Sequence, residues 1–186
     1  GSCWGIQMAA VAAGGEVQAH PKGREMGLGR KIMLTEEGRQ HPLHAGKPWV
    51  FDGFVSHDDV VTAIPPGGKL LSGNDFARVQ SLAVKYQKGC FWATQFHTEY
   101  DLYEVACLIV ARKEKLIRMG FYESEKELER HVARMKDLFA HPEKKNLRWQ
   151  LAAGEDVLDD RIRQCEFVNW LNRLVLPIHR GQAVEV

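Results

Sequence analysis

The chain opens with Gly1-Ser2-Cys3-Trp4-Gly5-Ile6-Gln7, and an alanine-rich stretch follows directly. The spacing G-x-C-x-G is typical of a nucleophile elbow, in which small residues let the chain turn sharply from a strand into a helix. A helix is predicted over Gln7–Ala13, because Gly14-Gly15 supplies the glycine stop that suits a helix C-terminus. Since a helix N-terminus favours the ionised form of a nearby thiol, we expect Cys3 to be a reactive thiolate.

A second chemically active group lies in Gln95-Phe96-His97-Thr98-Glu99, after an aromatic run that predicts a strand. A thiol nucleophile needs a proton donor for its leaving group, and histidine is the usual choice. A carboxylate bonded to one ring nitrogen fixes the tautomer and stabilises the protonated ring. Cys3, His97 and Glu99 therefore form a complete predicted triad, and the backbone N–H of Trp4 is the predicted donor to the developing oxyanion.

The composition bounds the class of protein. The chain has 186 residues, of which 45% are hydrophobic and 26% charged, and this suits one main globular domain. Its 25 Lys and Arg nearly balance its 24 Asp and Glu, so nucleic-acid binding is not expected. No apolar run reaches the ~18 residues that span a bilayer, so no membrane association is expected.

Cysteine usage points to a reducing cytoplasm, because the four cysteines include no C-x-x-C pair and no disulfide framework. Cys90, Cys107 and Cys165 lie in apolar contexts and are expected to be small buried side chains. No metal site and no organic cofactor are indicated.

Up to about residue 99 the chain alternates short β-rich runs with Gly, Pro and Asp turns. Strands are predicted over Glu16–His20, Arg30–Thr35, Trp49–Phe54, Lys69–Ser72, Val79–Gln87 and Cys90–Phe96. After residue 100 the apolar spacing becomes helical. Helices are predicted over Tyr103–Met119, over Ser124–Phe139 with a capping box formed by Ser124 and Glu127, and over Asp159–Val175 with Pro177 closing it. This predicts an α/β domain over 1–100, a helical extension packed on it over 101–176, and a mobile tail over 177–186.

The two end motifs resemble the G-x-C-x-G-x-Q and Q-F-H-x-E signatures of class I glutamine amidotransferase domains. Between them, the S-H-x-D, L-P-x-G, N and Q series of the GMP-synthetase-like branch is matched in order by Ser56-His57-Asp58-Asp59, Ile64-Pro65-Pro66-Gly67, Asn74 and Gln80. The resemblance covers residues 1–100 and implies the C-terminal portion of that family's flavodoxin-like α/β fold. The helices to about residue 176 resemble the C-terminal extension of stand-alone bacterial members.

The resemblance implies that Cys3 attacks the side-chain amide of glutamine, which gives a γ-glutamyl thioester and ammonia. An unidentified synthetase or other ammonia acceptor would be the partner. The resemblance also implies that Gln7, Ser56 and His57 contact the α-amino and α-carboxylate groups of glutamine. For His57 an ordinary role stays open, because a histidine in a turn can simply bond the backbone.

Two features depart from the family pattern. Family domains carry several strands and helices ahead of the elbow, including a loop that donates the second oxyanion hydrogen bond. Three explanations stay open for this chain: a truncated or proteolysed protein, a preceding segment supplied by another chain, and a Gly-Ser cloning remnant ahead of an N-terminal cysteine. In addition, Thr98 stands where the family usually has proline.

Two other functions stay open. The same fold and nucleophile can hydrolyse a different γ-glutamyl amide or a peptide, because a triad alone does not choose the acyl group. A domain with half of its oxyanion hole can also be a binding module that catalyses nothing.

Overall fold

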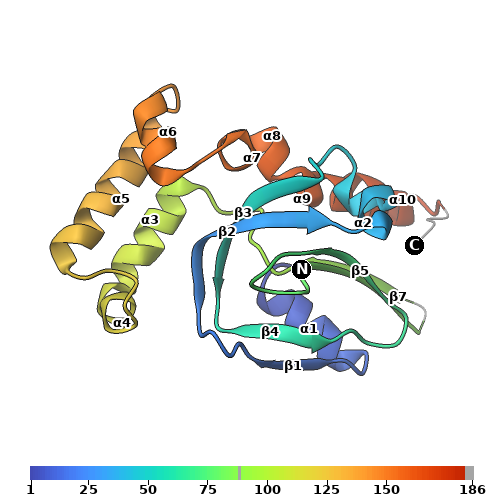
Figure 1. Cartoon of the computed structure of the whole chain (residues 1–186). Coiled ribbons are helices and arrows are strands. Elements are labelled where there is room, and N and C mark those ends of the chain that lie inside the picture. The colour runs from blue at the N-terminus through green and yellow to red at the C-terminus, as the bar shows by residue number, and fades with distance from the viewer. Residues whose placement is uncertain (88, 183–186) are drawn as a thin grey trace. The chain divides into compact units, whose positions relative to one another are not determined.

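The structure is a computed structural model that describes residues 1–87 and 89–182 (Figure 1). It divides into two compact units, one formed by Gly1–Glu99 with the segment from Asp160 onward, and the other by Tyr100–Asp159. In the described part of the chain no helix is long and apolar enough to cross a lipid bilayer. The predicted domain limits at residues 100 and 176 stay a prediction. Residues 183–186 of the predicted tail lie outside the described residues.

The first unit is built on an antiparallel five-stranded sheet with the order β3-β2-β5-β6-β7. Its strands are β2 (Glu25–Leu34), β3 (Val50–His57), β5 (Gly68–Gly73), β6 (Ser81–Tyr86) and β7 (Gly89–Thr94). A separate two-stranded antiparallel sheet pairs β1 (Glu16–Ala19) with β4 (Asp59–Ala63). The six predicted strands are all present, and β4 is an additional one.

Helix α1 (Trp4–Ala12) and the strands β6 and β7 share a core. Side chains alternate between the two faces of a strand, so Leu82 and Val84 pack with Ile6 and Ala10 of α1, whereas Ala83 joins a cluster on the other face. The predicted glycine stop of α1 is confirmed, since Gly14 has φ 93° and the Gly15 N–H donates to Ala10 O at 2.7 Å. The helix begins at Trp4, three residues earlier than predicted, directly after Cys3.

The opposite cluster receives the last helices of the chain. Leu174 packs with Leu43, Leu71, Ala83 and Trp92. The elements on this face are α2 (Glu36–Gln40), a 3₁₀ turn over Pro42–His44, α8 (Asp160–Arg163), α9 (Cys165–Trp170), a π-helical turn over Leu171–Val175 and α10 (Leu176–His179). The prediction that Pro177 closes this helical region is wrong. Proline is tolerated in the first turn of a helix, and Pro177 occupies that position in α10.

The second unit is wholly helical. Its helices are α3 (Leu102–Ala111), α4 (Lys113–Arg118), α5 (Glu125–Ala140), α6 (Lys145–Leu151) and α7 (Glu155–Leu158). The helix predicted over Tyr103–Met119 is broken at Arg112, whose φ of −114° is not helical. α5 buries Leu128, Val132, Met135 and Leu138 as predicted, but Phe139 is 48% exposed.

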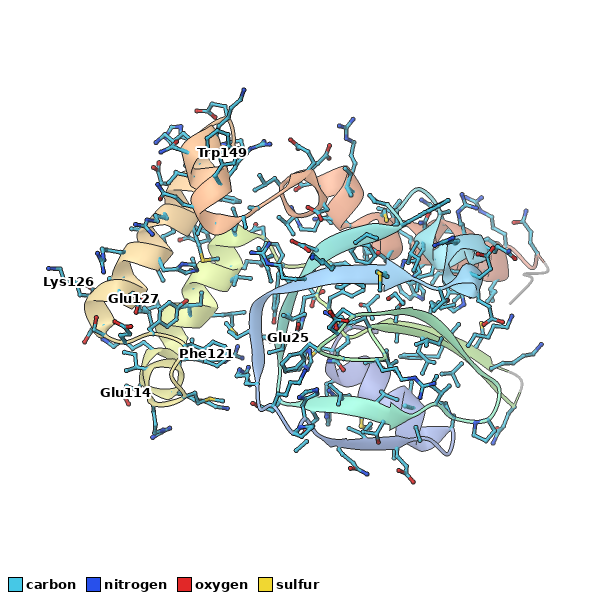
Figure 2. All side chains as sticks on the ribbon, viewed as in Figure 1. Glu25, Glu114, Phe121, Lys126, Glu127 and Trp149 are labelled. Carbon is cyan, nitrogen blue, oxygen red and sulfur yellow. The ribbon has the colours of Figure 1, made fainter. Side chains whose placement is uncertain are left out.

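The predicted capping box at α5 forms only in part. The Ser124 side chain accepts from the Glu127 N–H at 3.3 Å, but the Glu127 carboxylate accepts from the Glu123 N–H at 2.7 Å instead of from Ser124 (Figure 2). A complete capping box stands at α3, where Asp101 and Glu104 exchange both bonds.

Candidate active site

Cys3 stands at a strained turn between a short strand-like segment and α1. The Cys3 N–H donates to Thr94 O at 2.7 Å, the Thr94 N–H donates to Gly1 O at 3.0 Å, and Ser2 forms a parallel bridge with Thr94. Cys3 itself has φ 48° and ψ −102°. Such a backbone conformation costs a residue with a side chain on the order of 1–3 kcal/mol, and it persists where surrounding structure imposes it. The turn therefore has the shape that the G-x-C-x-G spacing predicts.

His97 is brought to the same place by the segment that follows β7. Its N–H donates to Phe54 O of β3 at 2.7 Å, which fixes the backbone beside the sheet. Its Nδ1 lies 2.7 Å from Oε1 of Glu99. The same carboxylate oxygen accepts from the Ser2 hydroxyl at 3.0 Å, so Glu99 also touches the residue that precedes Cys3.

The electrostatics favour a protonated imidazole. Burial by itself lowers the pKa of His97, but hydrogen bonds and charge interactions with Cys3 and Glu99 raise it from the usual 6.5 to about 9. For Glu99, burial acts to raise the pKa, and the hydrogen bond with His97 more than offsets this, so the pKa falls below its usual value. The structure thus brings Cys3, His97 and Glu99 together as an interacting set.

The residues predicted to bind substrate surround the thiol. The Trp4 N–H is in the first turn of α1, where N–H groups have no partner within the helix. Ser56 O lies 3.9 Å from Cys3 Sγ. Gln7 is buried, and its amide nitrogen donates to Asp59 O at 2.8 Å and to Gln95 Oε1 at 3.3 Å.

His57 is 3% exposed, and both of its ring nitrogens have partners. Its Nε2 lies 2.9 Å from Glu25 Oε2, and its Nδ1 lies 3.1 Å from Asp59 O. Glu25, labelled in Figure 2, reaches His57 from β2. In this arrangement His57 ties β2 to the start of β4.

Three polar residues near the site had no role in the sequence interpretation. Arg24 donates to the Ser56 hydroxyl at 2.8 Å and to the Asp58 carboxylate at 2.5 Å, directly behind the Ser56 carbonyl that faces the thiol. Glu25 receives a bond from Gln80 at 3.4 Å as well as contacting His57. Gln95 donates to Cys3 Sγ at 3.6 Å. Arg24 and Glu25 lie in a glycine-rich stretch without alternation, so spacing gave no signal, whereas Gln95 was visible as part of Q-F-H-x-E.

The other cysteines contrast with Cys3. Burial raises the pKa of Cys165 to about 12 and also raises that of Cys90, which disfavours their thiolates. The prediction that all three are buried is wrong for Cys107, which is exposed, while the other two are half-buried. Across residues 1–87 and 89–182, no group of three or more His, Cys, Asp or Glu side chains is placed to hold a metal ion.

Comparison with known proteins gives the chain its relatives. The family described as "Glutamine amidotransferase class-I" matches residues 1–113. A γ-glutamyl-L-1-hydroxyisopropylamide hydrolase from a Pseudomonas species is 32% identical over 183 residues, which cover 95% of this chain and 61% of that protein. A glutamine-hydrolysing GMP synthase from Aromatoleum aromaticum is 34% identical over 106 residues, 53% of this chain and 19% of that protein. Proteins named as one subunit of a glutamine-hydrolysing GMP synthase also match.

Solved structures support the fold. A glutamine amidotransferase from Methylobacillus flagellatus matches all of this chain and 64% of its own, with a TM-score of 0.56 and 17% identity. The chain therefore spans less than two thirds of the length of these relatives. The mixed α/β fold with a helical C-terminal region that the sequence predicted is confirmed. On the family match over residues 1–113, the chain belongs to the class I glutamine amidotransferase family.

Proposed function

We propose that this chain carries the acyl-transfer site of an enzyme that hydrolyses a γ-glutamyl amide through a cysteine thioester. The observation that carries the proposal is the meeting of three side chains at one turn. Cys3 stands on the strained residue before α1, His97 interacts with it, and Glu99 bonds His97 Nδ1 at 2.7 Å. A nucleophile, a proton carrier and an orienting carboxylate are the groups that acyl transfer from an amide requires.

The proposed acylation breaks a C–N bond and forms a C–S bond. The Cys3 thiolate adds to the γ-carbonyl carbon, and the Trp4 N–H donates to the oxyanion that develops. Glu99 occupies Nδ1 of His97, so Nε2 is the nitrogen that passes its proton to the departing amine. The products of this half-reaction are the γ-glutamyl thioester and a free amine or ammonia.

Deacylation reverses the role of the histidine. Neutral His97 takes a proton from water, whose oxygen adds to the thioester carbon, and the C–S bond then breaks. Glutamate leaves, and the thiolate is restored with the imidazolium beside it. The raised pKa of His97, about 9, suits this paired resting state.

The relatives favour an N-substituted amide as substrate. The similarity to the γ-glutamyl-L-1-hydroxyisopropylamide hydrolase covers 95% of this chain, including the helical region, whereas the similarity to the Aromatoleum GMP synthase covers 53%. We therefore propose a γ-glutamyl alkylamide as the preferred substrate, with glutamine as the smallest member of the same class. Gln7, Ser56 and His57 are proposed to shape the site for the glutamyl part that both substrates share.

Glutamine hydrolysis with transfer of ammonia to a synthetase partner is the second candidate. The observation that favours it is the match to GMP synthases, including those in which the glutamine-hydrolysing part is named as a subunit. The two candidates share every chemical step and differ only in the leaving group and in its fate. Their separation therefore needs a comparison of substrates and no change in the proposed roles of Cys3, His97 and Glu99.

The test measures glutamate release from a γ-glutamyl alkylamide and from glutamine, using the protein with whatever residues its gene encodes ahead of Gly1. We expect a higher kcat/KM for the alkylamide, and loss of both activities in Cys3→Ser. Cys107→Ser is the matched control, because Cys107 is an exposed cysteine. A preference for glutamine that increases on adding a synthetase would select the second candidate. A folded protein that hydrolyses neither substrate would leave only the binding-module reading.

A further inference from the structure

A chain of buried amide groups runs from β4 to the nucleophile. Gln95, two residues before His97, is fully buried, and its backbone N–H donates to Gln80 O at 2.7 Å. Its side-chain nitrogen lies 3.6 Å from Cys3 Sγ, and its side-chain oxygen lies 3.3 Å from the Gln7 amide nitrogen. That nitrogen in turn lies 2.8 Å from Asp59 O. Both ends of the Gln95 amide are therefore engaged.

The contacts fix which end of Gln95 faces the sulfur. Asp59 O is a backbone carbonyl and can only accept, so the Gln7 atom beside it must be the NH₂ group. The same NH₂ group faces Gln95, so the Gln95 atom that meets it must be the oxygen. The Gln95 NH₂ group is then left pointing at Cys3 Sγ. This orientation follows from the donor and acceptor chemistry and not from an arbitrary choice between oxygen and nitrogen.

A donor aimed at sulfur favours the ionised form of Cys3. A hydrogen bond to the charged form of a group stabilises that form, and the effect is stronger in a buried setting than in water. The charged neighbours are His97 and Glu99 after β7, and the Arg24–Asp58 pair behind Ser56. Gln95 is an uncharged donor in this surrounding, so it supports the thiolate at any pH at which the fold persists.

We propose that Gln95 is a thiolate-stabilising residue of the reaction, and that Gln7 positions it by setting the orientation of its amide. The proposal rests on the proposed function and deepens it. Gln95 touches the reacting sulfur atom, whereas Gln7 acts through Gln95. The sulfur receives two donors from the segment after β7, one charged from His97 and one neutral from Gln95.

The test is the pH dependence of Cys3 alkylation by iodoacetamide, a neutral reagent that reacts with the thiolate. The extent of labelling is read on the peptide that contains Cys3, so that the other cysteines do not contribute. Gln95→Glu keeps the size of the side chain and replaces the donor by a carboxylate. Gln95→Met removes the donor without adding charge. Gln150→Glu, at an exposed position of α6, is the matched control for the charge change.

For Gln95→Glu we expect alkylation at pH 7 to slow about tenfold, with the half-maximal pH rising by about one unit. Gln95→Met should shift it by less in the same direction, and Gln150→Glu should not shift it. A purely structural role would lower thermal stability without moving this midpoint. If Gln95→Glu does not fold, Gln95→Met decides alone, and an unmoved midpoint in a folded variant overturns the proposal. Failure of the proposed function looks different, because the midpoint would still move while the wild type hydrolyses no γ-glutamyl amide.

Discussion

Glu99 Oε1 lies 2.7 Å from His97 Nδ1 and 3.0 Å from the Ser2 hydroxyl, so one carboxylate oxygen links the two sides of the turn that carries Cys3. Only one residue separates His97 from Glu99 in sequence, and the histidine is held to β3 by its own N–H. The carboxylate can therefore orient the ring and at the same time support the segment that leads into the elbow.

Replacing Glu99 with glutamine should lower kcat far more than it raises KM. An amide can still bond Nδ1, but it does not stabilise the imidazolium, so proton transfer to the leaving group becomes slower by about 10²–10⁴-fold. Steady-state kinetics with a γ-glutamyl amide measures the loss. Glu16→Gln, at an exposed position of β1, should behave like the wild type. Equal activity of Glu99→Gln and Glu16→Gln would show that the carboxylate has no part in the reaction.

The pH dependence should follow His97. Because the folded protein raises the pKa of His97 from 6.5 to about 9, the imidazolium persists through neutral pH. Its contribution to stability is complete below about pH 6.5 and is lost as the pH rises through about 9. The rate of acylation should fall over the same alkaline range, because the leaving group then lacks its proton donor. A profile of kcat/KM that keeps rising from pH 8 to pH 10 would contradict this assignment.

Much of this site could be read from the sequence because its chemistry is concentrated in short motifs. Cys3 lies directly before the first helix, and His97 and Glu99 lie directly after the last strand, so local spacing is enough to identify them. The glycine stop of α1 and the buried face of α5 were predicted for the same reason, since each depends on neighbouring residues.

What could not be predicted depends on contacts between distant segments. The N-terminal half of β2 contains Gly27 and Gly29, and only its pairing with β3 makes it a strand. β4 was interpreted as part of a motif, and its strand character comes from pairing with β1. The helix expected to stop at Pro177 continues because a π-helical turn places that proline in a first turn. The role of Arg24 depends on Ser56, 32 residues away.

The core under α1 should be a major source of stability. Ile6 is fully buried among residues of β4, β6 and β7, so Ile6→Ala should destabilise the fold by about 2–5 kcal/mol through lost burial and a residual cavity. Urea unfolding measures the change. Val11→Ala on the same helix is the control, because Val11 is 56% exposed and should cost much less. Similar losses for both variants would argue against this packing of α1.

A buried ionic group should tie the last helices to the sheet. Glu166 of α9 is 2% exposed and bonds Lys47 at 3.1 Å and His44 at 3.2 Å. Burial acts to raise the pKa of Glu166, but Lys47 and His44 lower it below its usual value. Glu166→Ala leaves the Lys47 ammonium buried without its counter-charge, so it should destabilise the protein by about 3–5 kcal/mol.

The matched test of this pair is the double variant Lys47→Met/Glu166→Leu. It removes both charges and keeps the volume, so it should be more stable than Glu166→Ala alone. Thermal unfolding of the two variants and the wild type provides the comparison. A double variant that loses as much stability as the sum of the single losses would show that the two charges are not coupled.

The most direct test of the central claim is rapid quenching of the protein with a γ-glutamyl amide, followed by mass spectrometry of the peptide that contains Cys3. We predict a γ-glutamyl thioester on Cys3 that forms before glutamate reaches its steady rate of release, that is absent from Cys3→Ser, and that is present in Cys107→Ser. Hydrolysis that proceeds at the wild-type rate in Cys3→Ser, or an acyl group found on another residue, would contradict the account.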